Sequence, residues 1–126
     1  MFIHKMSKIW MFFASDHTGD IRYHVAVEAE NETEVGKFVK ENPDKFKDIY
    51  EFMEYCDDYS GKIRKLLYPP QSERQYPDLN VGELLSSIPD DKIVSEFWAY
   101  SKDSESTSVN VFCLNKEKIC KIHRVL

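Results

Sequence analysis

The chain has 126 residues, of which 42% are hydrophobic and 31% are charged. This length suits one globular domain, residues 1–126, which buries roughly two thirds of its unfolded surface without a metal or a disulfide. The composition excludes a disordered chain, and no apolar run approaches the roughly 20 residues that a membrane-spanning helix needs. We therefore expect a folded domain with no membrane segment.

The net charge of −5 is unevenly distributed along the chain. Residues 28–58 hold eleven acids against four lysines, a net charge of −7, whereas residues 115–126 hold four basic residues against one acid, a net charge of +3. A mostly acidic protein binds nucleic acid poorly, because contacts between basic side chains and phosphates supply most of that affinity. We therefore expect a basic protein partner and no direct contact with nucleic acid.

The cysteines and the N-terminal residues both indicate the cytoplasm. Three cysteines, Cys56, Cys113 and Cys120, are an odd number spread over a predicted helix and two predicted strands, as expected of reduced thiols. The first apolar run, residues 9–14, has only six residues and is short for the core of a signal peptide.

Two strands are predicted near the N-terminus. Residues 8–14 form a short apolar run, which is typical of a strand buried on both faces, and residues 15–20 are turn-like. The next residues alternate, with Tyr23 on an apolar side and His24 and Glu28 on a polar side. The pattern predicts a hairpin whose first strand is central in a sheet.

Two helices are predicted next. Asn31, with Glu34 three residues later, resembles a capping box and begins a short helix. Asn42 and Pro43 suit the N-cap and first position of one longer amphipathic helix, which loosens near Cys56. Its apolar face is predicted to comprise Phe46, Ile49, Tyr50, Met53 and Cys56.

The opposite face of this second helix is acidic and is the candidate partner-binding surface. Tyr55 points into the middle of the acidic face and Phe52 lies at its border. One interpretation is a solvated face with a stray aromatic residue. The other is a binding surface in which Tyr55 anchors a basic partner that the carboxylates attract. The candidate binding residues are Asp44, Asp48, Glu51, Phe52, Tyr55 and Asp58.

The second half of the chain is predicted to complete a sheet. Residues 62–68 fit either a helix or a strand, and Asn80 with Glu83 begins a short helix that Pro89 ends. Hydrophobic alternation then predicts strands over residues 93–101, 107–114 and 119–126, as a three-stranded meander. The fold class expected is α+β, with a single five-stranded antiparallel sheet and helices packed on it.

No group of residues predicts catalysis. The glycines form neither a phosphate-binding loop nor a nucleophile elbow, and Asp16 lies in a predicted turn. Cys120 and His123 face opposite sides of one predicted strand, which disfavours zinc. His24 and Glu28 share a strand face, either as an acid–base pair or as solvated residues. We expect no enzyme, no catalytic residues, no metal and no cofactor.

Two hypotheses for function remain. The first is an acidic inhibitor of the immunity or antidefence type, which blocks a basic toxin, nuclease or nucleic-acid-handling effector by protein–protein contact. The second is a small-ligand-binding homodimer with the His24 side as a pocket wall. It follows from the large apolar residues predicted on both sides of residues 8–14 and 93–101, which require a cover for the second face of the sheet.

Overall fold

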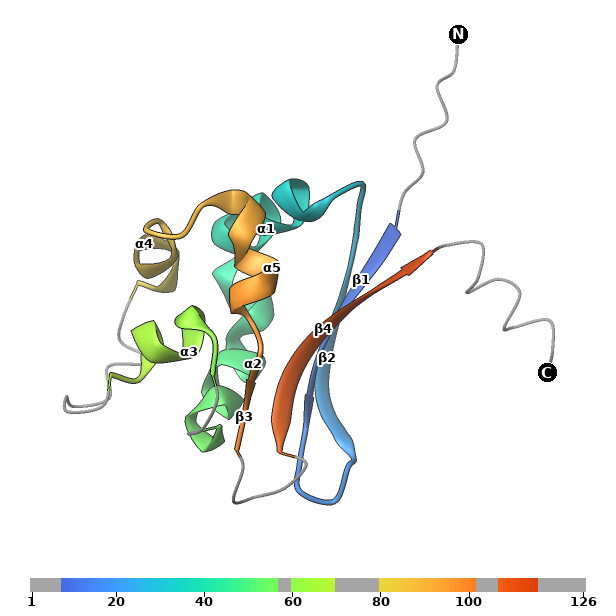
Figure 1. Cartoon of the computed structure of the whole chain (residues 1–126), viewed down its shortest axis with the longest axis vertical. Coiled ribbons are helices and arrows are strands. Elements are labelled where there is room, and N and C mark those ends of the chain that lie inside the picture. Colours follow the sequence, from blue (N-terminus) through green and yellow to red (C-terminus); the bar gives the residue numbers. More distant parts are fainter. Residues whose placement is uncertain (1–7, 57–59, 70–79, 102–106, 116–126) are drawn as a thin grey trace, which may run out of the picture.

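The structure, a computed structural model, describes residues 8–56, 60–69, 80–101 and 107–115. These residues form an α+β fold in which helices cover one face of an antiparallel sheet (Figure 1). The strand order is β2-β1-β4-β3, so β1 is an internal strand, as expected. The strands of the described residues are β1 (Lys8–Ser15), β2 (Ile21–Ala29), β3 (Ala99–Tyr100) and β4 (Ser108–Asn115).

The described residues form four strands, which does not match the five expected for the whole chain. The strand predicted over residues 93–101 is helical in its first four residues, which form α5 (Ile93–Glu96) directly after η3 (Asp90–Lys92), and it is extended only in β3. Ile93 and Phe97 are four residues apart and both buried, so the apolar spacing satisfies a helix as well as a strand.

The C-terminal meander is confirmed only in its middle strand. Residues 107–114 were predicted as a strand, and β4 occupies this region one residue further along the chain; it pairs with β3 and, over its whole length, with β1. In that second pairing, Phe12 of β1 lies opposite Val111. The strand predicted over residues 119–126 lies outside the described residues.

Local capping signals are confirmed. The Asn31 side chain accepts a hydrogen bond from the Glu34 N–H at 2.9 Å and begins α1 (Glu32–Glu41). The Asn80 side chain accepts one from the Glu83 N–H at 3.1 Å and begins α4 (Val81–Leu85). The undecided residues 62–68 are mostly helical, as α3 (Lys62–Leu67).

The predicted long amphipathic helix is divided into three short pieces. These are η1 (Pro43–Phe46), α2 (Lys47–Phe52) and η2 (Met53–Tyr55). Asn42 does not cap them, because its side chain donates to the Phe38 carbonyl at 2.9 Å and so ends α1 instead. The predicted apolar stripe is nevertheless correct, since all five of its residues are buried: Phe46, Ile49, Tyr50, Met53 and Cys56.

The core lies between the helices and the covered face of the sheet. Phe12 of β1 is fully buried, and its ring contacts those of Phe46 and Phe97 edge-on, at centroid distances of 5.0 and 4.8 Å. At the other end of β1, the Trp10 indole N–H donates to the Ala29 carbonyl at 3.1 Å. The helix containing Phe46 is therefore fixed against β1, which determines the side that it presents to solvent.

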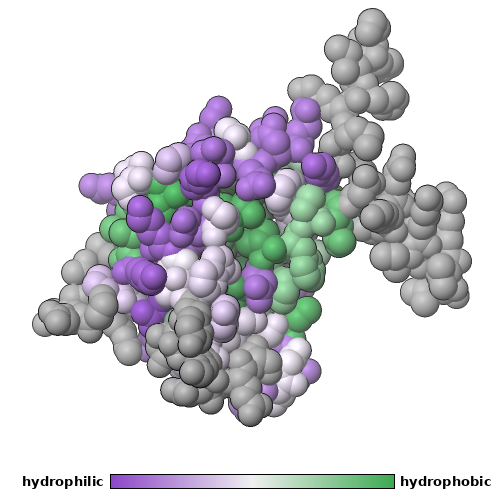
Figure 2. All heavy atoms as spheres, viewed as in Figure 1, coloured by the Kyte–Doolittle hydropathy of each residue, from purple (hydrophilic) through white to green (hydrophobic). Residues whose placement is uncertain are grey.

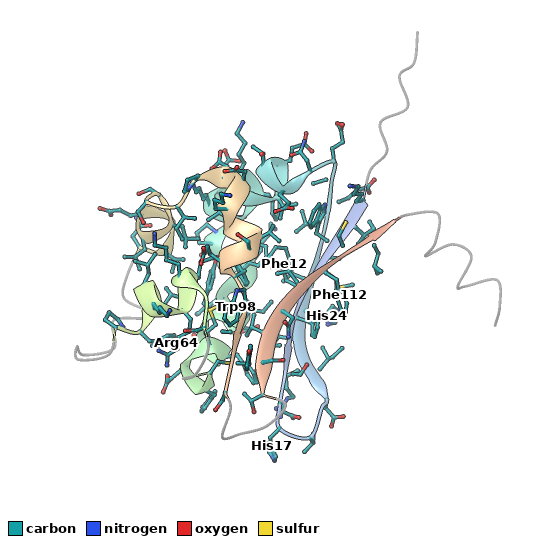
Figure 3. All side chains as sticks on the ribbon, in the orientation of Figure 1. Phe12, His17, His24, Arg64, Trp98 and Phe112 are labelled. Carbon is teal, nitrogen blue, oxygen red and sulfur yellow. The ribbon has the colours of Figure 1, made fainter. Side chains whose placement is uncertain are left out.

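The opposite face of the sheet carries apolar residues, as predicted for β1. Phe13 and Phe112 pack with their ring centroids 4.9 Å apart, and Phe112 is 51% exposed. Hydrophobic residues lie along this strand region in Figure 2, and Figure 3 labels Phe112 and His24 on the sheet. His24 and Glu28 are exposed residues of β2, and His24 is paired with Phe13 in the register.

Candidate functional site

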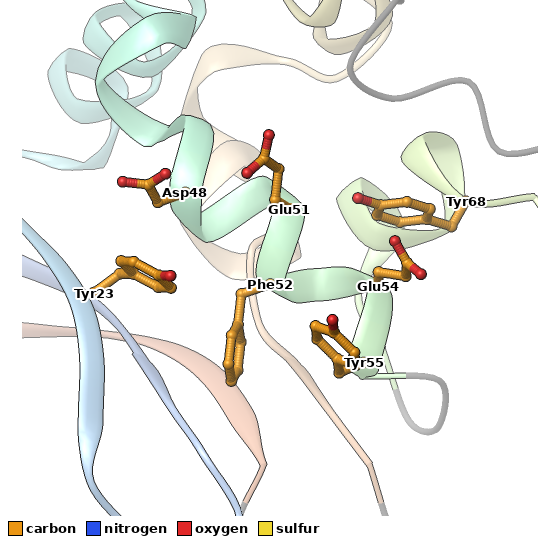
Figure 4. A pocket seen from close by; sticks show the side chains of 7 residues that line it. All are labelled: Tyr23, Asp48, Glu51, Phe52, Glu54, Tyr55 and Tyr68. Atoms are coloured by element: carbon orange, nitrogen blue, oxygen red, sulfur yellow. The ribbon is translucent and has the colours of Figure 1, made fainter.

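A pocket with a volume of about 350 Å³ opens where α2 and η2 face β2 and the end of α3 (Figure 4). This volume lies at the lower end of the range of roughly 300–1,000 Å³ that is usual for ligand pockets. Aromatic and acidic residues line it: Tyr23, Asp48, Glu51, Phe52, Glu54, Tyr55 and Tyr68.

The carboxylates of the pocket come from one face of the helical run. Asp48, Glu51 and Glu54 are spaced by three residues, which places them one above another on a helix. On the other side, Ile49, Tyr50 and Met53 are buried, so the helical run cannot rotate about its axis without exposing them. Packing of the apolar stripe therefore holds the carboxylates toward solvent.

Three aromatic rings form a row beside these carboxylates. Phe52 lies between Tyr23 and Tyr55, with ring centroids 6.2 and 5.9 Å apart and both contacts edge-on (Figure 4). Tyr55 is 65% exposed and Tyr23 is 38% exposed, while Phe52 is half-buried against the core. The row is an apolar surface within an acidic one.

Arg64 ties the α3 side of the pocket to η2. Its guanidinium donates to the carbonyls of Met53 at 3.2 Å, Tyr68 at 3.1 Å and Glu54 at 3.4 Å. The hydroxyl of Tyr68 in turn donates to the Tyr50 carbonyl at 3.0 Å. Because these bonds join the lining segments to one another, the shape of the pocket is set before any partner binds.

The structure brings together four of the six candidate binding residues. Asp48, Glu51, Phe52 and Tyr55 line the pocket, whereas Asp44 is exposed on η1 outside the lining. Asp58 lies outside the described residues.

Three lining residues were not among the candidates. Glu54 belongs to the acidic helix face and was recognisable from the helical spacing. Tyr23 and Tyr68 reach the pocket from β2 and from the end of α3, through contacts that no local sequence pattern reports.

The pocket is negatively charged. Three of its lining residues are carboxylates, and none of the lining residues is a lysine or an arginine. The guanidinium of Arg64 lies beside one wall, 5.3 Å from the centroid of the Tyr68 ring, and offsets part of this charge. The remaining charge favours a cationic group and disfavours a phosphate.

The other candidates lie elsewhere. His24 and Glu28 are exposed residues of β2 that are not part of the pocket lining. Cys113 is an exposed residue of β4, while Cys120 and His123 lie outside the described residues. In the part of the chain that the structure describes, no group of three His, Cys, Asp or Glu residues is placed to hold a metal ion.

Asp16 accepts hydrogen bonds from backbone N–H groups of the hairpin turn. Its Oδ1 accepts hydrogen bonds from the Thr18 N–H at 2.9 Å and the Asp20 N–H at 3.2 Å, and Arg22 lies 3.3 Å from Oδ2. The hydrogen bond from the Thr18 side chain is the largest of the effects that lower the pKa of Asp16 to about 2. This carboxylate therefore stabilises the turn.

Comparisons of the chain with protein-family models, curated proteins and solved structures gave no match. Over the residues that the structure covers, no helix has both the length and the apolar character needed to cross a membrane.

Proposed function

We propose that this protein is a non-enzymatic acidic inhibitor of the immunity or antidefence type. It binds a basic protein, such as a toxin, nuclease or nucleic-acid-handling effector, and blocks it by contact. The observation that carries the proposal is the partly exposed row Tyr23–Phe52–Tyr55 set among three carboxylates around one pocket. The proposal also places the protein in the cytoplasm, in keeping with the thiols of Cys56 and Cys113.

The two kinds of residue support binding in different ways. The carboxylates of Asp48, Glu51 and Glu54 attract a basic surface over a distance and raise the rate of encounter. Tyr55 offers a large exposed ring that loses water on contact, and tyrosine is among the residues that most often dominate binding energy. Such a surface repels DNA and RNA phosphates, which agrees with a protein partner rather than a nucleic acid.

Capture from the native host with matched variants tests this proposal. The tagged protein is expected to capture a basic protein and to inhibit its activity when the two are mixed. Tyr55→Ala and Glu51→Lys are expected to lose both effects. Tyr100→Ala and Glu41→Lys change an exposed tyrosine and an exposed acid outside the pocket lining and are expected to keep them. Capture that is equal for all four variants contradicts the proposal.

The open face of the sheet supports a second candidate function, a small-ligand-binding homodimer. The observation in its favour is the exposed Phe112 packed on Phe13, next to the half-buried Ile9, Met11 and Leu114. Sedimentation at micromolar concentration distinguishes the two candidates. A dimer that Phe112→Glu converts to a monomer supports the homodimer, and a monomeric wild-type protein excludes it.

A further inference from the structure

The pocket on the acidic face combines two kinds of wall (Figure 4). The first kind is aromatic and the second is acidic: Tyr23, Phe52, Tyr55 and Tyr68, and Asp48, Glu51 and Glu54. An anion would be repelled by the carboxylates, and an uncharged apolar group would remove them from water without giving them a partner. The occupant that satisfies both walls carries a positive charge and a flat or apolar surface.

Arginine fits this description better than lysine. The guanidinium is planar, stacks on aromatic faces, and presents five N–H donors that several carboxylates can share. A lysine ammonium is a compact and strongly hydrated charge, which gains less from aromatic rings. Within the structure, Arg64 already holds its guanidinium 5.3 Å from the centroid of the Tyr68 ring, so one pocket residue makes this kind of contact with an arginine.

The size of the pocket limits what enters it. A volume of about 350 Å³ is small for a cofactor or a folded element but sufficient for one long side chain. The hydrogen bonds of Arg64 to η2 and of Tyr68 to Tyr50 hold the walls in place, which lowers the entropy cost of ordering a side chain between them.

We propose that this pocket receives an arginine side chain presented by the basic partner. Its guanidinium lies among the carboxylates of Asp48, Glu51 and Glu54, and its aliphatic stem lies along the row of Tyr23, Phe52 and Tyr55. The inference rests on the proposed function, because it assumes that the partner binds at this face. It adds the type of residue that the partner must supply and thereby the basis of specificity.

The test uses the full chain and three short peptides, with titration followed by NMR. The probes are acetyl-Gly-Gly-Arg-Gly-Gly-amide and the same peptide with lysine or with citrulline, the uncharged isostere of arginine. The arginine peptide is expected to shift the resonances of Tyr23, Phe52 and Tyr55 and to bind about fivefold or more tightly than the lysine peptide. The citrulline peptide is expected to cause no saturable shift. Equal affinities for arginine and lysine, or shifts confined to residues outside the pocket, overturn the inference.

Variants decide whether the peptide occupies this pocket. Glu51→Gln and Tyr55→Ala are each expected to weaken the arginine peptide about tenfold, whereas Glu41→Gln and Tyr100→Ala are expected to leave its affinity unchanged. Tyr55 and Glu51 are exposed, so circular dichroism of their variants is expected to match that of the wild type. A loss of affinity that is the same for pocket and control variants overturns the assignment.

Failure of this inference is distinguishable from failure of the proposed function. If the pocket variants lose the captured partner while the arginine peptide shows no preference over lysine, the inhibitor proposal stands and the arginine assignment is wrong. If the peptide binds as described while capture is unaffected by the pocket variants, the arginine site stands and the proposed inhibitor interface is wrong.

Discussion

Arg64 and Tyr68 contact each other in two ways, since the guanidinium lies 5.3 Å from the centroid of the tyrosine ring and donates to the tyrosine carbonyl at 3.1 Å. The same guanidinium reaches the carbonyls of Met53 and Glu54, where the helical run ends. The carbonyls at the end of a helix have few intrahelical partners, and the Arg64 side chain donates to two of them in η2. It thereby fixes η2 to the end of α3 and holds this wall of the pocket in place.

Replacement of Arg64 tests this role. Arg64→Met keeps an apolar stem but removes all donors, so we expect the free energy of unfolding to fall by about 1–3 kcal/mol, because the carbonyls of Met53 and Glu54 each lose one hydrogen bond. Urea unfolding measures the change. Lys65→Met, at the neighbouring exposed position, is the control and is expected to change stability by less than about 0.5 kcal/mol. Equal effects of the two substitutions would show that Arg64 does not join η2 to α3.

Gly36→Ala gives a second prediction, because the direction of its effect on stability distinguishes helix propensity from close packing. Alanine within a helix normally stabilises it by up to about 1 kcal/mol relative to glycine. At position 36 an added Cβ would lie 1.9 Å from the carbonyl oxygen of Asp90, so α1 and η3 would have to separate. We expect Gly36→Ala to destabilise the protein by roughly 1–3 kcal/mol in thermal or urea unfolding. Lys37→Ala is the matched control, and a stabilising Gly36→Ala would contradict the close packing of these two segments.

The proposed partner-binding face predicts that its acidic residues and its tyrosine act on different rate constants. Asp48→Lys and Glu51→Lys are expected to slow association, because the wild-type acids raise the rate above the roughly 10⁵ to 10⁶ M⁻¹s⁻¹ of neutral partners. The wild-type rate is expected to fall with salt as the Debye length shrinks from ~30 Å at 0.01 M to ~8 Å at physiological strength. Surface plasmon resonance with the captured partner measures both effects.

Controls for this experiment come from the same chain. Glu41→Lys and Asp91→Lys make the same change in charge at exposed positions outside the pocket lining and are expected to slow association less. Tyr55→Ala is expected to act on dissociation, with a loss of about 2 kcal/mol or more if the ring is a dominant contact. Rates that respond to none of the pocket substitutions would mean that this face is only solvated.

Asp16 predicts how the stability of the hairpin depends on pH. Its pKa is about 2 in the folded protein and 3.8 without the fold. Between these two pH values the carboxylate stays ionised in the folded state, whereas it takes up a proton in the unfolded state. The contribution of Asp16 is therefore complete above pH ~5 and is lost as the pH falls toward ~2.

Asp16→Asn tests this dependence. The difference in urea midpoint between wild type and Asp16→Asn is expected to be largest at neutral pH and to shrink toward pH ~2. Thr18→Val keeps the carboxyl but removes the donor that lowers its pKa most, so it is expected to weaken the same pH dependence. A midpoint difference that stays constant over this range would show that the turn does not depend on the charge of Asp16.

Local patterns in the sequence predicted local structure well. The Asn31 and Asn80 caps form as expected, because each involves a side chain and an N–H only three residues apart. The buried stripe of the acidic helical run followed from helical spacing alone, and so did the common location of Asp48, Glu51 and Tyr55. The helical spacing that brings these residues together can be recognised in the sequence without knowledge of the fold.

What the sequence did not predict depends on tertiary contacts. The spacing of Ile93 and Phe97 fits a helix and a strand equally, and the packing of the core selects the helix. Asn42 can cap either the helix before it or the helix after it, and it caps the one before. Tyr23 reaches Phe52 only after β2 packs under the helices, so its role in the pocket required the register of the sheet.

The place of β1 between β2 and β4 also has a consequence for biosynthesis. β1 pairs with β2 across a single turn, but its other edge pairs Lys8 with Asn115, at the far end of the described chain. During translation that edge has no partner until β4 has left the ribosome, and pairing between such distant segments slows folding. The nascent protein therefore exposes an unpaired strand edge beside Phe12 and Phe13 while the residues between β2 and β4 are made, which is the interval in which a chaperone has most to protect.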